Sequence, residues 1–240
     1  MRRLYDFLAS LDLGIWLVAG VMLFLGIGSF VTKEGSAINS VPLFAWLTGA
    51  PLSETWWLWA TLVILALLAL NTVLCSVESL RAKWQRGNFL VRIAPQLMHA
   101  GFLFIMLAHL ISADGGVKDG GALPEGGSFS FPDGSRAELV SLDIRTGAMG
   151  MPVAFSGLLR HHAPTGEVRT VFSPNNPYFY GGYGVYLKHV EPFPVKTAML
   201  EIHREPGAFS ALLGGVLFTA ANLVLLWMRR GRRQTASQPQ

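Results

Sequence analysis

The stretch Ala94–Ser112 reads APQLMHAGFLFIMLAHLIS and contains no charged side chain. In a helix its 19 residues rise about 28 Å, close to the roughly 30 Å of hydrocarbon in a bilayer. Core helices of soluble proteins are rarely this long without a charge. Pro95 falls in the first turn, where the missing N–H of proline costs little. We therefore expect a transmembrane helix, and the glycine and charged residues from Asp114 onward indicate a different structure after it.

Three other stretches have the same character and predict further spans at Leu13–Val31, Trp56–Val77 and Phe209–Met228. The whole chain is 51% hydrophobic, only slightly above an average soluble protein. The clustering of apolar residues, and not their total, therefore indicates a membrane protein with four spans. The apolar segment 41–47 is too short to span and is expected to lie along the outer interface as a short helix.

Basic residues cluster in three segments: before the first span, between spans two and three, and after the fourth span. They are Arg2, Arg3, Arg81, Lys83, Arg86, Arg92, Arg229, Arg230, Arg232 and Arg233. The loop between the first two spans has Lys33 as its only cation. The positive-inside rule therefore predicts a multi-pass protein with both termini in the cytoplasm and the large loop outside. That large loop, residues 113–208, carries eight basic and ten acidic residues, so the net positive charge of the chain comes from the cytoplasmic segments. There it favours contact with anionic lipid and not with nucleic acid.

Residues 113–208 are expected to form a small extracytoplasmic all-β domain, a sandwich or a barrel. Short β-rich runs separated by glycine, proline and asparagine indicate this class. They are Ser128–Phe131, Ala137–Ile144, Val153–Arg160, Glu167–Phe172, Tyr183–Val190 and Thr197–His203. The glycine-rich segment Asp114–Gly127 is expected to be a flexible exit from the membrane. Residues 1–112 then hold spans one to three, and residues 209–240 hold span four and a polar cytoplasmic tail.

Two histidines lie inside the third span, where a polar side chain is costly unless it is paired or used. His99 lies about one turn from the cytoplasmic end, and His109 lies near the outer end. They are ten residues apart, about 15 Å along a helix, so one planar cofactor cannot be bound by both. A neutral imidazole is a natural axial ligand for haem iron. From the residues alone, a hydrogen bond that packs helices or a headgroup contact is the simpler explanation for both, and more so for His109 next to the outer boundary.

Other polar or aromatic residues have simple structural explanations. Asn71 and Cys75 share a face of span two, where the amide can bond another helix. The only cysteine is Cys75, so the outer domain has no disulfide. The histidines of that domain show no zinc-type spacing, and neighbours His161 and His162 point to opposite faces of a strand. The segment Tyr178–Tyr186, YFYGGYGVY, is either a platform for haem or a partner, or a tyrosine-rich sheet core.

Five short motifs, taken in their order, resemble the ResB family, also called CcsB, of system II cytochrome c biogenesis proteins. The start Phe7–Leu17 resembles F-x-x-S-L-K-L-x-I-x-L, and Asn71–Cys75 resembles N-x-x-L-C. His99–Leu107 is similar to H-x-G-F-L-L-I-L-L. Tyr183–Tyr186 resembles a late strand of the family's outer domain, and Arg204–Gly207 resembles its R-D-P-G exit into the last span. The chain is a short form, because family members carry a larger outer domain, and Asp12 replaces a common lysine.

The resemblance implies a protein of the bacterial cytoplasmic (inner) membrane that works with a CcsA/ResC-type partner. Together they carry haem across the membrane and present it to the thiols of apocytochrome c. In the family a histidine at the start of span three helps to ligate haem b, and that residue is His99 here. The second ligand then comes from the partner. The chain would form part of a synthetase complex and not be an enzyme on its own.

Two other functions are open. A haem b electron-transfer subunit usually needs histidines on two facing helices, whereas spans one, two and four contain none. A structural assembly factor, which anchors a β-domain that docks a partner, needs no cofactor, and His99 would then serve packing alone.

Overall fold

The computed structural model describes residues 2–32, 38, 41–83, 89–147, 150–164 and 166–236. Lys33 and Arg86, used above for the charge pattern, and the end of the polar tail, 237–240, lie outside the described residues. The chain divides into two compact units. One contains the helices up to Asp114 and from Gly207 onward, and the other is made chiefly of Gly115–Pro206.

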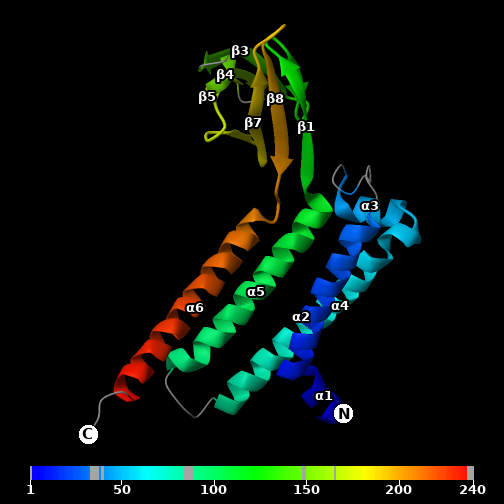
Figure 1. Ribbon diagram of the computed structural model, residues 1–240, viewed down its shortest axis with the longest axis vertical. Coiled ribbons are helices and arrows are strands. Elements are labelled where there is room, and N and C mark those ends of the chain that lie inside the picture. The colour runs from blue at the N-terminus through cyan, green and yellow to red at the C-terminus, as the bar shows by residue number, and fades with distance from the viewer. Residues whose placement is uncertain are drawn as a thin grey trace. The chain divides into compact units, whose positions relative to one another are not determined.

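Six helices form the described part of the helical unit (Figure 1). They are α1 (Arg2–Leu8), α2 (Leu11–Val31), α3 (Leu43–Gly49), α4 (Leu52–Lys83), α5 (Phe89–Gly115) and α6 (Ala208–Ala236). Of these, α2, α4, α5 and α6 are long and apolar enough to cross a membrane. Only 11% to 22% of each hydrophobic window is buried within the protein, so most of these apolar side chains face outward, as a lipid environment requires. Four helices of the described residues thus have the length and composition of membrane spans, and they lie at the four expected places.

The ends of these helices differ from the expected spans. α5 begins at Phe89, so Pro95 lies inside the helix and the prediction of a first-turn proline is wrong. Residues 89–93, which are apolar except for Arg92, continue the helix before the uncharged stretch that marks the span. The short α1 was also not expected; it is separated from α2 by Ser10, whose hydroxyl accepts a hydrogen bond from the Leu13 amide at 3.2 Å and caps α2.

Small residues bring the long helices together. A Cβ atom on Gly28 of α2 would collide with the Trp57 ring of α4. A Cβ atom on Gly101 of α5 would lie 2.7 Å from the carbonyl oxygen of Gly214 on α6. Such close backbone approach is the usual way in which helices pack inside a bilayer. Trp57 also packs with Trp46 and Leu47 of α3, so the short helix expected near 41–47 is present and is held by α4.

The second unit is a β-sandwich of two antiparallel four-stranded sheets. One sheet has the order β1-β8-β7-β6 and the other β2-β3-β4-β5. The strands are β1 (Val117–Pro124), β2 (Ser128–Ser130), β3 (Arg136–Thr146), β4 (Pro152–Ala163), β5 (Gly166–Phe172), β6 (Tyr178–Tyr180), β7 (Tyr183–Glu191) and β8 (Thr197–Arg204). Buried side chains of both sheets form one core, including Leu139, Leu159, Phe172, Val185 and Leu187. Of the sandwich and barrel alternatives, the sandwich is present.

The expected flexible exit at Asp114–Gly127 is wrong for most of its length. Val117–Pro124 pairs residue for residue with β8, because backbone hydrogen bonds to a neighbouring strand do not require side chains that favour strands. The short strand β6 was also not expected. It pairs with β7 across Gly181 and Gly182, which both have positive φ. The six expected strands correspond to β2, β3, β4, β5, β7 and β8, with differences at their ends.

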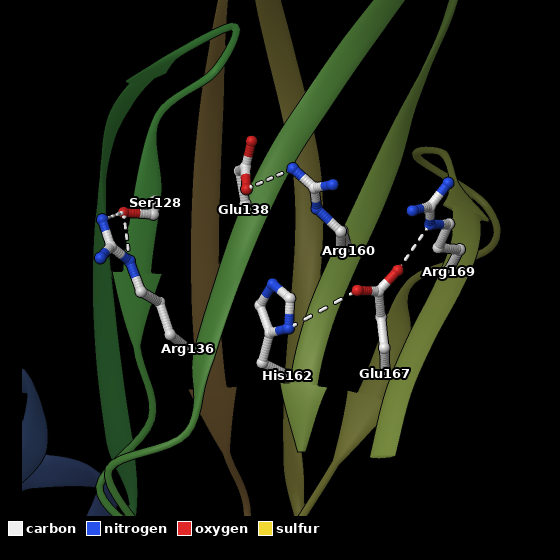
Figure 2. Close-up of polar contacts among 7 residues, drawn as sticks. All are labelled: Ser128, Arg136, Glu138, Arg160, His162, Glu167 and Arg169. Carbon is white, nitrogen blue, oxygen red and sulfur yellow. Dashed lines mark hydrogen bonds and ion pairs between the residues drawn. The ribbon is translucent and has the colours of Figure 1, made fainter.

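The outward face of the second sheet carries charged side chains in pairs, between neighbouring strands and within β5 (Figure 2). Arg160 on β4 bonds Glu138 on β3 at 2.8 Å, and Arg169 bonds Glu167 on β5 at 2.7 Å. His162 lies 3.7 Å from Glu167 and is half-exposed. Exposed pairs of this kind contribute little to stability because water and salt screen them, so they mark the solvent face of the sheet more than they stabilise it.

Candidate functional site

His99 lies on α5 and forms a hydrogen bond to a neighbouring helix. Its Nδ1 atom lies 2.8 Å from the hydroxyl of Ser76 on α4, and the imidazole is half-buried. The same hydroxyl lies 2.8 Å from the carbonyl oxygen of Thr72, one turn back along α4. Within the described part of the chain, the second ring nitrogen, Nε2, has no hydrogen-bond partner. One ring nitrogen of His99 is therefore used in a hydrogen bond, and the other could bind a ligand.

His109, the second candidate, lies in different surroundings. Its side chain is exposed on α5 near the end of the helix, and no hydrogen bond joins it to any other described residue. The structure does not bring His99 and His109 together, as expected from their separation on one helix. Of the two histidines in the described spanning helices, only His99 therefore has a ring nitrogen held by a hydrogen bond.

Asn71 has a structural role. Its side chain is only 5% exposed, and its Nδ2 atom donates to the carbonyl oxygens of Leu8 at 2.7 Å and Ser10 at 2.9 Å. These two carbonyls lie at the junction of α1 and α2. The Leu8 carbonyl is at the end of α1, where helix carbonyls have no partner within the helix, and the Ser10 carbonyl also accepts from the Gly14 amide at 3.3 Å. Asn71 therefore bonds a neighbouring segment, as expected, and its partners there are backbone atoms. Cys75 is a half-buried free thiol.

The β-sandwich buries a histidine of its own. His161 on β4 is fully buried, with Nδ1 lying 2.9 Å from the Tyr178 hydroxyl and Nε2 lying 2.9 Å from the Ser135 hydroxyl. Ser135 donates in turn to Asp133 at 2.6 Å, and Tyr180 donates to the other oxygen of Asp133 at 2.7 Å. His162 is exposed on the other face of the same strand, which confirms the expectation that the two neighbours diverge.

The electrostatics of this cluster follow from burial and hydrogen bonding. Burial lowers the pKa of His161, and the negative charge of Asp133 only partly opposes this effect. The hydrogen bonds from Ser135 and Tyr180 lower the pKa of Asp133. The ring is therefore neutral, and both of its nitrogens are used within the protein, so His161 ties strands of the two sheets together and offers no atom to a ligand.

The aromatic segment Tyr178–Tyr186 belongs mainly to the sandwich. Tyr178, Tyr180 and Tyr183 pack against the core of the unit, as the sheet-core explanation predicts. Phe179 points outward and is 65% exposed. Its ring packs against Tyr186 at a centroid distance of 6.2 Å.

The remaining histidines of the sandwich are placed differently. His189 is exposed. The imidazole of His203 lies 3.0 Å from Glu201, which also contacts Lys188 at 2.8 Å and Lys118 at 3.0 Å. Hydrogen bonds from the two lysines and from the histidine lower the pKa of Glu201 to about 2. Among the described residues, no three His, Cys, Asp or Glu side chains come together as a metal site requires.

His99 stays a prediction as a functional residue; the sequence offered no sign of its partner Ser76 or of Ser135, and it indicated Tyr178 only as part of the aromatic segment Tyr178–Tyr186. Ser76 follows Thr72 by four residues and therefore shares its helix face, but this spacing alone does not show which neighbouring helix the face meets. Ser135 and Tyr178 lie far from His161 in the sequence. The pairing of β3 with β4 brings Ser135 to its ring, and the packing of the two sheets brings Tyr178.

No family model matches the sequence. No curated protein sequence matches it either. Among solved structures, the chain is similar to the cytochrome c heme lyase CcmF, with 18% identity and a TM-score of 0.45. The match covers 88% of this chain and 34% of CcmF, so the chain spans about a third of the length of that protein.

Proposed function

We propose that this chain is a membrane protein of cytochrome c biogenesis, of the system II type, which works with a CcsA/ResC-type membrane partner to deliver haem to apocytochrome c. The ordered motifs shared with the ResB family support the proposal. They include Asn71–Cys75 on α4, His99–Leu107 on α5, and Arg204–Gly207 between β8 and α6. The chain is not an enzyme on its own in this proposal; it holds and passes haem within a synthetase complex.

His99 is the proposed axial ligand for haem b. The proposal rests on one observation: only one ring nitrogen of His99 has a hydrogen-bond partner. The Ser76 hydroxyl lies 2.8 Å from Nδ1, and Nε2 has no partner among the described residues. A ligating histidine typically bonds through its second nitrogen to the surrounding protein, so the residues present fit the group. When bound, haem supplies the iron porphyrin that the complex transfers to the client protein.

The second axial ligand is proposed to come from the partner protein. In the described spanning helices the histidines are His99 and His109, and ten residues of one helix separate them. About 15 Å along the axis is too far for both to bind the same iron. This arrangement also disfavours an electron-transfer subunit of the haem b type, which needs histidines on two facing helices of its own.

The proposed orientation places the protein in the bacterial inner membrane with both termini in the cytoplasm. The β-sandwich then lies outside, where apocytochrome c receives haem. Reporter fusions at Gly150 and at Gln240 test the orientation. A reporter enzyme that is active on only one side of the membrane should be active at one of the two positions and inactive at the other. The same side at both positions would contradict the four-span topology.

A structural assembly factor is the second candidate, and one observation favours it. The Ser76–His99 hydrogen bond joins α4 to α5 with or without a cofactor, so His99 has a packing role in either case. The two functions differ in what the loss of the ring changes: a packing residue affects assembly, whereas an axial ligand affects haem.

The test is His99→Ala in the complex purified from its native membrane. We expect insertion and partner recovery to persist, because alanine makes the span more apolar. We expect bound haem to fall by roughly tenfold or more, at least the loss caused by removing an outer-shell partner of a metal ligand. Haem per complex and the visible spectrum measure the effect, and added imidazole should restore both in part by filling the vacant position.

The matched control is His109→Ala, which removes a histidine from the same helix near its other end. It should leave haem content close to that of the unchanged protein. A His99→Ala complex with unchanged haem content and spectrum would refute the ligand role. Loss of the partner together with haem, without rescue by imidazole, would favour the assembly factor.

A further inference from the structure

The Ser76 hydroxyl has two hydrogen-bond neighbours and only one proton. Its Oγ atom lies 2.8 Å from the Thr72 carbonyl oxygen and 2.8 Å from Nδ1 of His99. A carbonyl oxygen can only accept, whereas an imidazole nitrogen either donates or accepts according to its tautomer. Both contacts are hydrogen bonds only if the serine gives its proton to the carbonyl. The Oγ atom then accepts from His99, and Nδ1 carries the ring proton.

This chain of bonds determines which nitrogen remains for a ligand. A neutral imidazole with a proton on Nδ1 has its lone pair on Nε2. Nε2 is the nitrogen without a partner among the described residues. The backbone of α4, through Thr72 and Ser76, therefore holds the His99 ring in the one neutral form that presents Nε2 as a ligand atom.

We propose that Ser76 is a positioning residue for haem binding: it accepts the Nδ1–H of His99, and so fixes both the tautomer and the orientation of the ligand ring. The inference rests on the proposed function of His99 and adds a second residue to that site. Partners of this kind raise the basicity of a metal-ligating imidazole and are worth roughly 10- to 100-fold in metal affinity.

The haem-free protein tests the tautomer directly. Nitrogen NMR of the full chain, labelled on histidine and solubilised in detergent, should show His99 with Nδ1 protonated and Nε2 bare. The signal is assigned by its absence in His99→Gln. In Ser76→Ala the ring should shift toward the Nε2–H tautomer, which a free imidazole favours. Protonation of Nε2 in the unchanged protein would overturn the inference.

The haem-loaded complex tests the positioning role. Ser76→Ala should weaken haem binding by about tenfold and make the reduction potential more positive, because a less basic imidazole stabilises ferric iron less well. Ser76→Thr keeps a hydroxyl at the same place and should restore the affinity, the potential and the spectrum. A purely structural serine would leave the potential and spectrum of the bound haem unchanged.

Ser29 on α2 is the matched control. Its hydroxyl also donates to a carbonyl four residues back, that of Leu25 at 3.1 Å, and no histidine bonds to it among the described residues. Ser29→Ala should leave haem affinity and potential unchanged. If Ser76→Ala behaves like Ser29→Ala in a complex whose haem depends on His99, the positioning role is refuted. If His99→Ala itself leaves haem unchanged, the proposed function fails, and the NMR result still decides how Ser76 and His99 are bonded.

Discussion

Two histidines of this protein are bonded to serine hydroxyls in nearly the same way, one in the helical unit and one in the sandwich. His99 meets Ser76 at 2.8 Å, and His161 meets Ser135 at 2.9 Å. In both cases the serine proton goes elsewhere, to the carbonyl of Thr72 or to the carboxylate of Asp133. The histidine therefore donates to the serine at both sites.

The difference lies at the second ring nitrogen. In His161 the second nitrogen accepts from Tyr178, and the ring is fully buried, so its bonding capacity is used up. In His99 the second nitrogen has no partner within the described residues, and the ring is only half-buried. A fully bonded buried histidine stabilises a fold, because leaving either partner without a bond costs about 1–3 kcal/mol. A half-bonded histidine retains a lone pair for chemistry.

The largest effect should come from removing the fully bonded ring. His161→Ala leaves a cavity in the core and strips partners from Tyr178 and Ser135. We expect the sandwich to lose about 3 kcal/mol of stability. Hydrogen exchange of β4 and β7 in the full chain, followed by mass spectrometry, measures the loss. The proposed haem site should be unaffected, which is the opposite of the result expected for His99→Ala.

His162→Ala is the control for this change. It removes the neighbouring histidine, whose half-exposed ring lies 3.7 Å from Glu167, and should alter exchange little. Tyr178→Phe removes one of the two bonds of His161 and should cost about 1 kcal/mol. Equal protection in His161→Ala and the unchanged protein would remove the contrast between the two histidines.

A smaller effect should appear with pH. Burial lowers the pKa of His161 below its ordinary value of 6.5, so the unfolded chain takes up a proton before the folded sandwich does. Stability is therefore complete above pH 6.5 and should fall below it, by at most about 1.4 kcal/mol per pH unit, until the folded ring also titrates. The charged or titratable groups around the ring are Asp133, Tyr178, Tyr180 and His162.

Hydrogen exchange at several pH values, corrected for the intrinsic rate of each amide, tests this expectation. His161→Gln keeps polar atoms in the core without a titrating ring and should abolish the dependence between pH 6.5 and the lower pKa. His162→Ala should retain it. Glu201 does not interfere, because its pKa falls from 4.5 to about 2 and its contribution changes only at more acidic pH. A slope that persists in His161→Gln would assign the effect to another group.

The sequence was sufficient to locate the four long apolar helices and to single out His99 as a candidate. Long uncharged stretches such as Ala94–Ser112 predict spanning helices, since the free energy of leaving water depends on composition and length. A histidine inside such a stretch stands out because polar groups are costly there. The alternation of β-rich runs likewise predicted the class of the outer unit and six of its strands, although it missed β1, which is rich in glycine, and the short β6.

Composition and order along the chain thus determined the four spans, the existence of a β-rich unit and the presence of a polar residue that needs an explanation. Only the tertiary structure decided which atoms meet. The rotation of α4 against α5 brings Ser76 to one nitrogen of His99. The pairing of β3 with β4 brings Ser135 to one nitrogen of His161, and the stacking of the two sheets brings Tyr178 to the other. The reason is physical. The hydrophobic contribution sums over many residues, so the order of residues along the chain already shows it. A hydrogen bond requires two atoms from distant segments within about 3 Å, and only helix rotation and sheet packing set that distance.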